Sequence, residues 1–154
     1  MGKAMFYHLT RNPLEVTAAN LLIRALAQGM RVAVRARENA RLEWLDAALW
    51  LGPKDSFLPH GVAGGPHDAD QPILLTKQTE NPNAAKIVMA IDSAAALPQE
   101  VAHLERLWIL FDGNDPDAVA HARGQWKAMA GAGIMAEYWS EDSGRWELKA
   151  QTDR

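Results

Sequence analysis

The stretch Leu107-Trp108-Ile109-Leu110-Phe111 decides the fold, because it is an unbroken run of large apolar residues. A short run of this kind that is followed at once by turn residues is typical of a strand buried on both faces of a sheet. The turn after it, Asp112-Gly113-Asn114-Asp115-Pro116, also predicts the capped start of a helix from about Pro116 to Ala130. A final strand or hairpin is expected over 134–148.

The same alternation of strands and helices precedes the run. Short apolar segments predict strands over 4–9, 31–35, 72–75 and 86–91. Apolar residues at helical spacing predict a helix that ends at Gln28, with Asn12 as its cap and Pro13 at its first position, and further helices over 38–51 and 98–104. This order predicts a three-layer α/β sandwich around a mostly parallel central sheet. We expect one domain over 1–150, a short tail over 151–154 and a long loop over 54–71.

Composition limits the classes of function. The chain has 154 residues, 16 of them basic and 19 acidic, so its formal charge of −3 does not favour a nonspecific grip on a phosphate backbone. It has no cysteine, which excludes disulfides and thiolate metal sites. Because no apolar run is long enough for a secretory or membrane-spanning segment, we expect a cytoplasmic protein without membrane contact.

The sequence signals for a catalytic site are weak. The expected strand-to-helix turn at 10–13 has no glycine, so the fold would be nucleotide-binding-like but without a phosphate loop. A glycine-rich stretch over 61–67 could cradle a phosphate, and an enzyme that uses the loop from Gly61 to Asp70 for a nucleotide or phosphate is the alternative function. Two clusters resemble metal sites but lack the required spacing, so we expect no metal and no cofactor; they are His60, His67, Asp68 and Asp70, and Asp112, Asn114, Asp115 and Asp117.

One aromatic group surrounds the end of the second helix. If Leu42, Leu45 and Leu49 form its buried stripe, Trp50 lies roughly 120° from the centre of that stripe and is a candidate for exposure. Phe57 follows in the loop. Either the two aromatic residues form a small separate core under this loop, or they form a protein-binding surface, and their pattern does not decide between these alternatives.

A second aromatic residue lies between two cations on the last helix. Arg123, Trp126 and Lys127 occupy positions i, i+3 and i+4, which places them on one face of the helix. This combination suits a ligand with a terminal aromatic residue and nearby carboxylates. Taken alone, the pattern favours a half-buried tryptophan whose neighbouring cations extend into solvent.

Taken in order, several short motifs resemble one known family, the chi subunit of bacterial DNA polymerase III. They extend from the first strand to about Trp146 and comprise Met5-Phe6-Tyr7, Arg31-Val32-Ala33-Val34, Leu45-Asp46-Ala47-Ala48-Leu49-Trp50, Ser56-Phe57-Leu58-Pro59-His60, Ala122-Arg123, Gln125-Trp126-Lys127-Ala128 and Gly133.

The resemblance implies a non-catalytic accessory subunit of the clamp-loader assembly that acts in DNA replication and contacts DNA only indirectly. Proteins of this family receive the acidic, phenylalanine-terminated tail of single-stranded-DNA-binding protein, and the matching positions here are Arg123, Trp126 and Lys127. A further lysine of the family corresponds to Val119 in this chain. The family's second surface, which binds a psi-type subunit or a helicase-like partner, corresponds to Trp50, Pro53 and Phe57.

Overall fold

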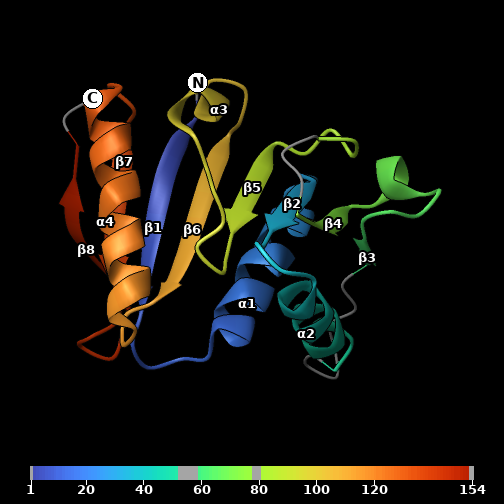
Figure 1. Ribbon diagram of the computed structural model, residues 1–154, viewed down its shortest axis with the longest axis horizontal. Coiled ribbons are helices and arrows are strands. Elements are labelled where there is room, and N and C mark those ends of the chain that lie inside the picture. The colour runs from blue at the N-terminus through green and yellow to red at the C-terminus, as the bar shows by residue number, and fades with distance from the viewer. Residues whose placement is uncertain (1, 52–58, 78–80, 153–154) are drawn as a thin grey trace.

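The computed structural model describes residues 2–51, 59–77 and 81–152 and contains one eight-stranded sheet. Its strand order is β3-β4-β2-β5-β6-β1-β7-β8 (Figure 1). All neighbouring strands are parallel except the last pair, β7 and β8. The strands are β1 (Lys3–Leu9), β2 (Val32–Arg35), β3 (Gly61–Val62), β4 (Ile73–Thr76), β5 (Ile87–Ala90), β6 (Arg106–Asp112), β7 (Ala136–Ser140) and β8 (Glu147–Gln151).

Helices cover both faces of this sheet. The helices are α1 (Leu14–Ala27), α2 (Asn39–Trp50), α3 (Pro98–Val101) and α4 (Pro116–Gly131), and a 3-10 turn, η1, spans Asp68–Asp70. Residues of α1 and α2 pack in one apolar cluster, and residues of α3 and α4 pack in a second cluster. Figure 1 shows α4 beside β1 and β7 and shows α2 near β3 and β4. The predicted three-layer α/β sandwich with a mostly parallel sheet is confirmed.

The apolar run that predicted the fold lies near the middle of the sheet. Strand β6 pairs in parallel with β1 on one side and β5 on the other. Trp108 and Leu110 belong to the cluster with α1 and α2, whereas Leu107, Ile109 and Phe111 belong to the cluster with α3 and α4. Each of the five side chains is at most 5% exposed. Successive side chains of β6 point to opposite faces of the sheet, and both faces are covered by helices. No position of the strand therefore needs a polar residue, which explains the unbroken apolar run.

Local predictions hold where the signal is local. Asp115 caps α4, since its Oδ1 accepts a hydrogen bond from the backbone N–H of Asp117 at 3.0 Å, and Pro116 follows in the first helical position. Gly29 adopts a φ of +75° just after α1, a conformation that favours glycine. The apolar stripe of α2 is buried as predicted.

Three local predictions are wrong. Pro13, not Asn12, occupies the cap position of α1, and no side chain caps that helix. The segment at 98–104 is helical only to Val101. The expected loop over 54–71 contains a strand in its described part, because Gly61–Val62 pairs in parallel with Leu74 and Leu75.

The C-terminal hairpin extends the sheet by β7 and β8. Strand β8 runs to Gln151, and the backbone N–H of Thr152 donates to the carbonyl of Ala136 at 2.9 Å. Among the helices of the described ranges, none has the length and apolar character needed to cross a membrane.

The topology creates a crevice at the carboxyl ends of two central strands. Strands β1 and β6 are neighbours, but the helices that follow them, α1 and α4, belong to opposite faces of the sheet. In doubly wound sheets, the point at which successive helices leave on opposite faces is where ligands usually bind. The crevice is therefore the first place to search for a catalytic site.

Candidate functional site

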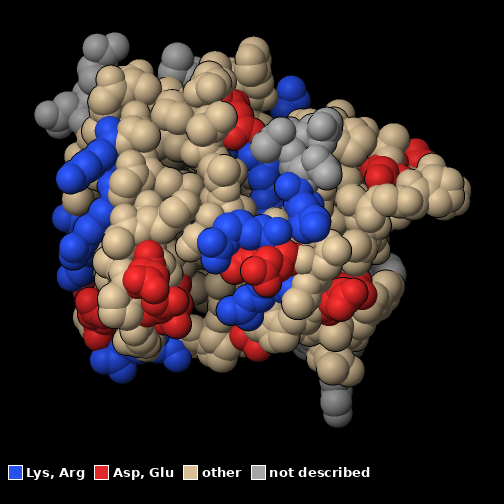
Figure 2. All heavy atoms as spheres, in the orientation of Figure 1, with Lys and Arg blue, Asp and Glu red and all other residues tan. Residues whose placement is uncertain are grey.

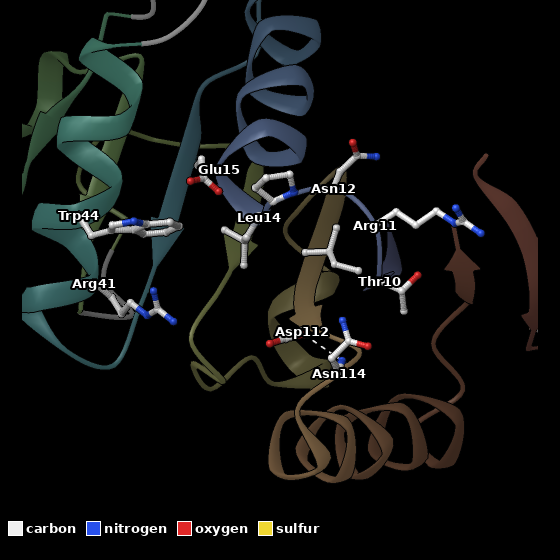
Figure 3. A pocket seen from close by; sticks show the side chains of 11 residues that line it. Thr10, Arg11, Asn12, Leu14, Glu15, Arg41, Trp44, Asp112 and Asn114 are labelled. Atoms are coloured by element: carbon white, nitrogen blue, oxygen red, sulfur yellow. Dashed lines mark hydrogen bonds between the residues drawn. The ribbon is translucent and has the colours of Figure 1, made fainter. Parts of the chain in front are cut away.

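The crevice contains a cavity of about 390 Å³ (Figure 3). It is lined by the segment after β1, the start of α1, the end of β6 and two residues of α2. The two α2 residues are Arg41 and Trp44, and the Arg41 guanidinium lies 5.0 Å from the centre of the Trp44 ring. Asp112 and Asn114 close the opposite side, where the Asn114 backbone N–H donates to Asp112 Oδ1 at 2.8 Å.

The backbone donors beside this cavity are already occupied by a carboxylate of the chain. Glu141 Oε2 accepts hydrogen bonds from the backbone N–H groups of Thr10, Arg11 and Asn12 at 2.9, 3.0 and 3.1 Å. Its Oε1 accepts a further bond from the Asn12 side-chain amide at 2.7 Å. Nucleotide-binding folds offer such N–H groups after their first strand to a phosphate. Here Glu141, which is 1% exposed, takes the place of that anion.

These hydrogen bonds determine how Glu141 titrates. Burial alone would raise the pKa of its carboxyl group, but the hydrogen bonds from Arg11, Asn12 and Thr10 outweigh burial and hold the pKa below its usual value of 4.5. A depressed pKa in the folded protein means that ionised Glu141 stabilises the fold above its unfolded pKa. That contribution is lost as the pH falls through the folded pKa.

We therefore expect acid to unfold the parent protein in a way that depends on Glu141. Between about pH 6 and about pH 3, the parent should lose more free energy of unfolding than the Glu141→Gln variant, because the amide does not titrate. Urea unfolding monitored by circular dichroism at each pH measures both. Equal losses for the two proteins would contradict the assigned role of this carboxylate.

The glycine-rich loop over 61–67, which the alternative function would use for a phosphate, already binds a carboxylate of the chain. Asp68 Oδ2 accepts a hydrogen bond from the backbone N–H of Gly64 at 3.0 Å, and Asp68 Oδ1 accepts one from Gly65 at 3.2 Å. The N–H groups that would hold a phosphate thus already bind a carboxylate.

The residues considered as a metal cluster are separated. The buried His60 has its Nε2 3.0 Å from Asp46 Oδ1 of α2, whereas His67 and Asp70 are both exposed and lie 3.8 Å apart. Within 2–51, 59–77 and 81–152, no three or more His, Cys, Asp and Glu side chains gather as metal ligands. His60 thus links the strand β3 region to α2.

Arg123, Trp126 and Lys127 lie together on α4, and we call them the α4 surface. Arg123 and Lys127 are exposed, and Trp126 is half-buried. Val119, one turn before Arg123, packs against the apolar cluster beneath the helix. Gln125 Nε2 donates to the carbonyl of Ala94 at 3.2 Å and so ties this part of α4 to the neighbouring loop.

An aromatic cluster supports the indole of Trp126 from below. Its ring meets those of Phe6 and Tyr138 edge-on, with centroid distances of 5.3 and 5.9 Å. The Tyr138 hydroxyl is hydrogen-bonded to Nδ1 of His8 at 2.6 Å. Tyr138 and His8 could not be predicted as part of this site, since they come from β7 and β1 and no local pattern in the sequence relates them to α4. Alternation along β7 was the available signal, because it places Tyr138 and Trp139 on opposite faces.

The α4 surface carries positive charge next to this aromatic cluster. Burial raises the pKa of the Tyr138 hydroxyl, and the nearby Arg123 charge opposes this rise, so the guanidinium lies within electrostatic reach of the ring. Figure 2 shows basic side chains in a column along the edge of the molecule where α4 and β8 lie, with acidic side chains near the start of α4. The arrangement offers an apolar base with cations at its rim.

Trp50 ends α2 and is 56% exposed, which confirms the expected exposure of its side chain. Its ring packs on the imidazole of His60, with ring centroids 4.5 Å apart. Pro53 and Phe57, the other two residues of the predicted second surface, lie outside the described residues.

Comparison with known proteins gives the family of this chain. The chain is 25% identical over 91 residues to the probable DNA polymerase III subunit chi of Rickettsia prowazekii (strain Madrid E), a match that covers 59% of this chain and 55% of that relative. It thus spans little more than half the length of that relative. Residues 1–137 match the family described as DNA polymerase III chi subunit, HolC. The chain belongs to the DNA polymerase III chi subunit family.

Proposed function

We propose that this chain is a non-catalytic accessory subunit that links the clamp loader of the DNA polymerase III holoenzyme to single-stranded-DNA-binding protein. The link is made by the acidic tail of that protein, which docks on the α4 surface. Family membership supports the setting. The observation that carries the proposal is an exposed arginine and lysine beside a half-buried tryptophan on α4.

Each residue of the α4 surface has a different task in this proposal. The terminal phenylalanine of the tail packs against Trp126 at the edge of the aromatic cluster, where apolar area is buried. Arg123 grips a carboxylate through two parallel N–H donors, and Lys127 adds a second charge that attracts the acidic part of the tail. Val119 stands where the family has a further lysine, so apolar contact carries more of the affinity in this chain.

A second partner completes the proposed role. The surface around Trp50, together with Pro53 and Phe57, binds a psi-type subunit or a helicase-like partner. Exposed aromatic residues are frequent anchors of such interfaces. In this arrangement the chain works in the cytoplasm and contacts DNA through its partners.

The alternative function, an enzyme that binds a nucleotide or phosphate, is disfavoured. The backbone N–H groups that would hold a phosphate already donate to the carboxylates of Asp68 and Glu141.

Calorimetric titration with a peptide of the tail sequence tests the proposal, and the affinity is expected to depend on salt. Two exposed cations facing several carboxylates are screened once the Debye length falls below about 8–10 Å. We therefore expect the affinity to fall several-fold between about 0.05 and about 0.5 M salt. An affinity that does not change with salt would show that Arg123 and Lys127 do not hold the carboxylates.

A further inference from the structure

A second groove lies on the face of the sheet opposite α4. Figure 1 shows β7 and β8 at the edge of the sheet away from α1, so this end of the sheet extends past the helix. Between α1 and the hairpin is a cavity of about 340 Å³. We call it the α1 groove, and the residues used below are Val16 and Arg24 of α1, Met5 and Tyr7 of β1, and Trp139 and Trp146 of the hairpin.

The hairpin side of the α1 groove is aromatic, and its rings have defined partners. The rings of Tyr7 and Trp146 meet edge-on at a centroid distance of 5.3 Å, and Trp139 Nε1 donates to Glu137 Oε1 at 3.0 Å. Val16, on the α1 side, is 44% exposed. Trp139 and Trp146 are only half-buried and Val16 is exposed, so apolar side chains on both sides of the groove are accessible to a partner.

One end of the groove is positively charged. A neighbouring cavity of about 220 Å³ shares Met5, Tyr7 and Arg24 with the first and adds Arg106 at the start of β6. Within the described part of the chain, neither Arg24 nor Arg106 forms an ion pair, whereas the nearby Lys3 is paired with Glu137 at 3.0 Å. The two guanidinium groups therefore have forked donors available for carboxylates.

We propose that the α1 groove is a second peptide-docking site, which takes a partner segment with apolar side chains at one end and carboxylates at the other. The apolar residues lie against Trp139, Trp146 and Val16, and the carboxylates pair with Arg24 and Arg106. This site lies on the other side of the sheet from the α4 surface and does not depend on the proposed function.

The distribution of charge favours a peptide over single-stranded nucleic acid. A nucleic acid strand carries a charge at every nucleotide, and proteins that bind it place cations along the whole track. In the α1 groove, Trp139 and Trp146 line only the first cavity and Arg106 lines only the second, while Arg24 lines both. An acidic segment followed by apolar residues matches that order.

The test uses the peptide acetyl-Asp-Asp-Glu-Leu-Leu-Phe-amide and its uncharged counterpart acetyl-Asn-Asn-Gln-Leu-Leu-Phe-amide. Nitrogen-proton spectra of the full chain follow the indole N–H signals of Trp139 and Trp146 for the α1 groove and of Trp126 for the α4 surface. With the Arg123→Ala protein, the acidic peptide should shift the Trp139 and Trp146 signals to saturation. Arg24→Ala should weaken this binding about tenfold, whereas the control Lys149→Ala, which removes an exposed charge elsewhere on the hairpin, should change it less than about twofold.

Several results would overturn the inference. If the Trp139 and Trp146 signals did not move, the α1 groove would not be a docking site. If only the Trp126 signal moved in the parent protein, the α1 groove would be excluded while the proposed function of the α4 surface would still hold. Equal shifts with the uncharged peptide would show that Arg24 and Arg106 do not select carboxylates. Stronger binding of a short oligothymidylate than of the acidic peptide at these two indoles would assign the groove to nucleic acid.

Discussion

Replacing Glu141 with alanine is expected to lower the free energy of unfolding by about 3–5 kcal/mol, because it removes a buried carboxylate together with its hydrogen-bonding role. Three backbone N–H groups and the Asn12 amide would lose their acceptor at once. The C-terminal hairpin would then be tied to the segment after β1 chiefly by the Arg11 guanidinium, which donates to the carbonyl of Asp142 at 3.0 and 2.7 Å. Urea unfolding at neutral pH measures the change.

Glu147→Ala is the matched control for this prediction. It removes a carboxylate from the same hairpin, but the Glu147 side chain is 39% exposed, so the expected change is much smaller than that of Glu141→Ala. Glu141→Gln keeps an acceptor oxygen and should fall between the two. If Glu141→Ala were as stable as Glu147→Ala, the Glu141 carboxylate would not stabilise the fold through its hydrogen bonds to the backbone N–H groups after β1.

The Arg123→Ala change is expected to weaken binding of the tail peptide about 30- to 150-fold, which corresponds to about 2–3 kcal/mol. A guanidinium forms two parallel bonds with a carboxylate, whereas an ammonium is a point charge. Lys127→Ala should therefore weaken binding less, and Arg123→Lys should restore only part of the affinity. Calorimetric titration of each variant with the tail peptide gives the comparison.

The control for Arg123→Ala is its stability. Arg123 is exposed, so the variant should unfold at nearly the parent's urea concentration. Trp126→Ala is a weaker test, because that ring also packs against Phe6 and Tyr138 and its loss should destabilise the fold. A folded Arg123→Ala protein that bound the tail as tightly as the parent would exclude α4 as the docking helix.

The fold could be predicted where its signals are local. The run from Leu107 to Phe111 is apolar because both faces of β6 are covered. The cap of α4 is Asp115, whose side chain bonds to the backbone of Asp117, only two residues further along the chain. The prediction of Asn12 as a cap was wrong because α1 starts one residue later than expected, with Pro13 at the cap position, while the Asn12 side-chain amide donates to the distant Glu141. Strand β3 was missed because Gly61–Val62 is too short to show a periodic pattern, and its partners lie in β4.

The residues of the candidate site also divide into those with a local sequence signal and those that only the fold brings together. Arg123, Trp126 and Lys127 belong to one helix, so their spacing was enough to group them. Tyr138 meets Trp126 and His8 meets Tyr138 only because β1 and β7 are parallel neighbours, with His8 paired to Ser140 and Phe6 to Tyr138. The α1 groove likewise combines α1, β1 and the hairpin, and no single segment of the sequence contains its aromatic and basic residues together.

The central claim is that this chain captures single-stranded-DNA-binding protein by its tail. The most direct measurement is a titration of the chain with that protein in two forms, one intact and one lacking the acidic, phenylalanine-terminated tail, followed by calorimetry under identical salt. We expect saturable binding of the intact form and loss of binding for the shortened form. Equal binding of both forms, or no binding of the intact one, would contradict it.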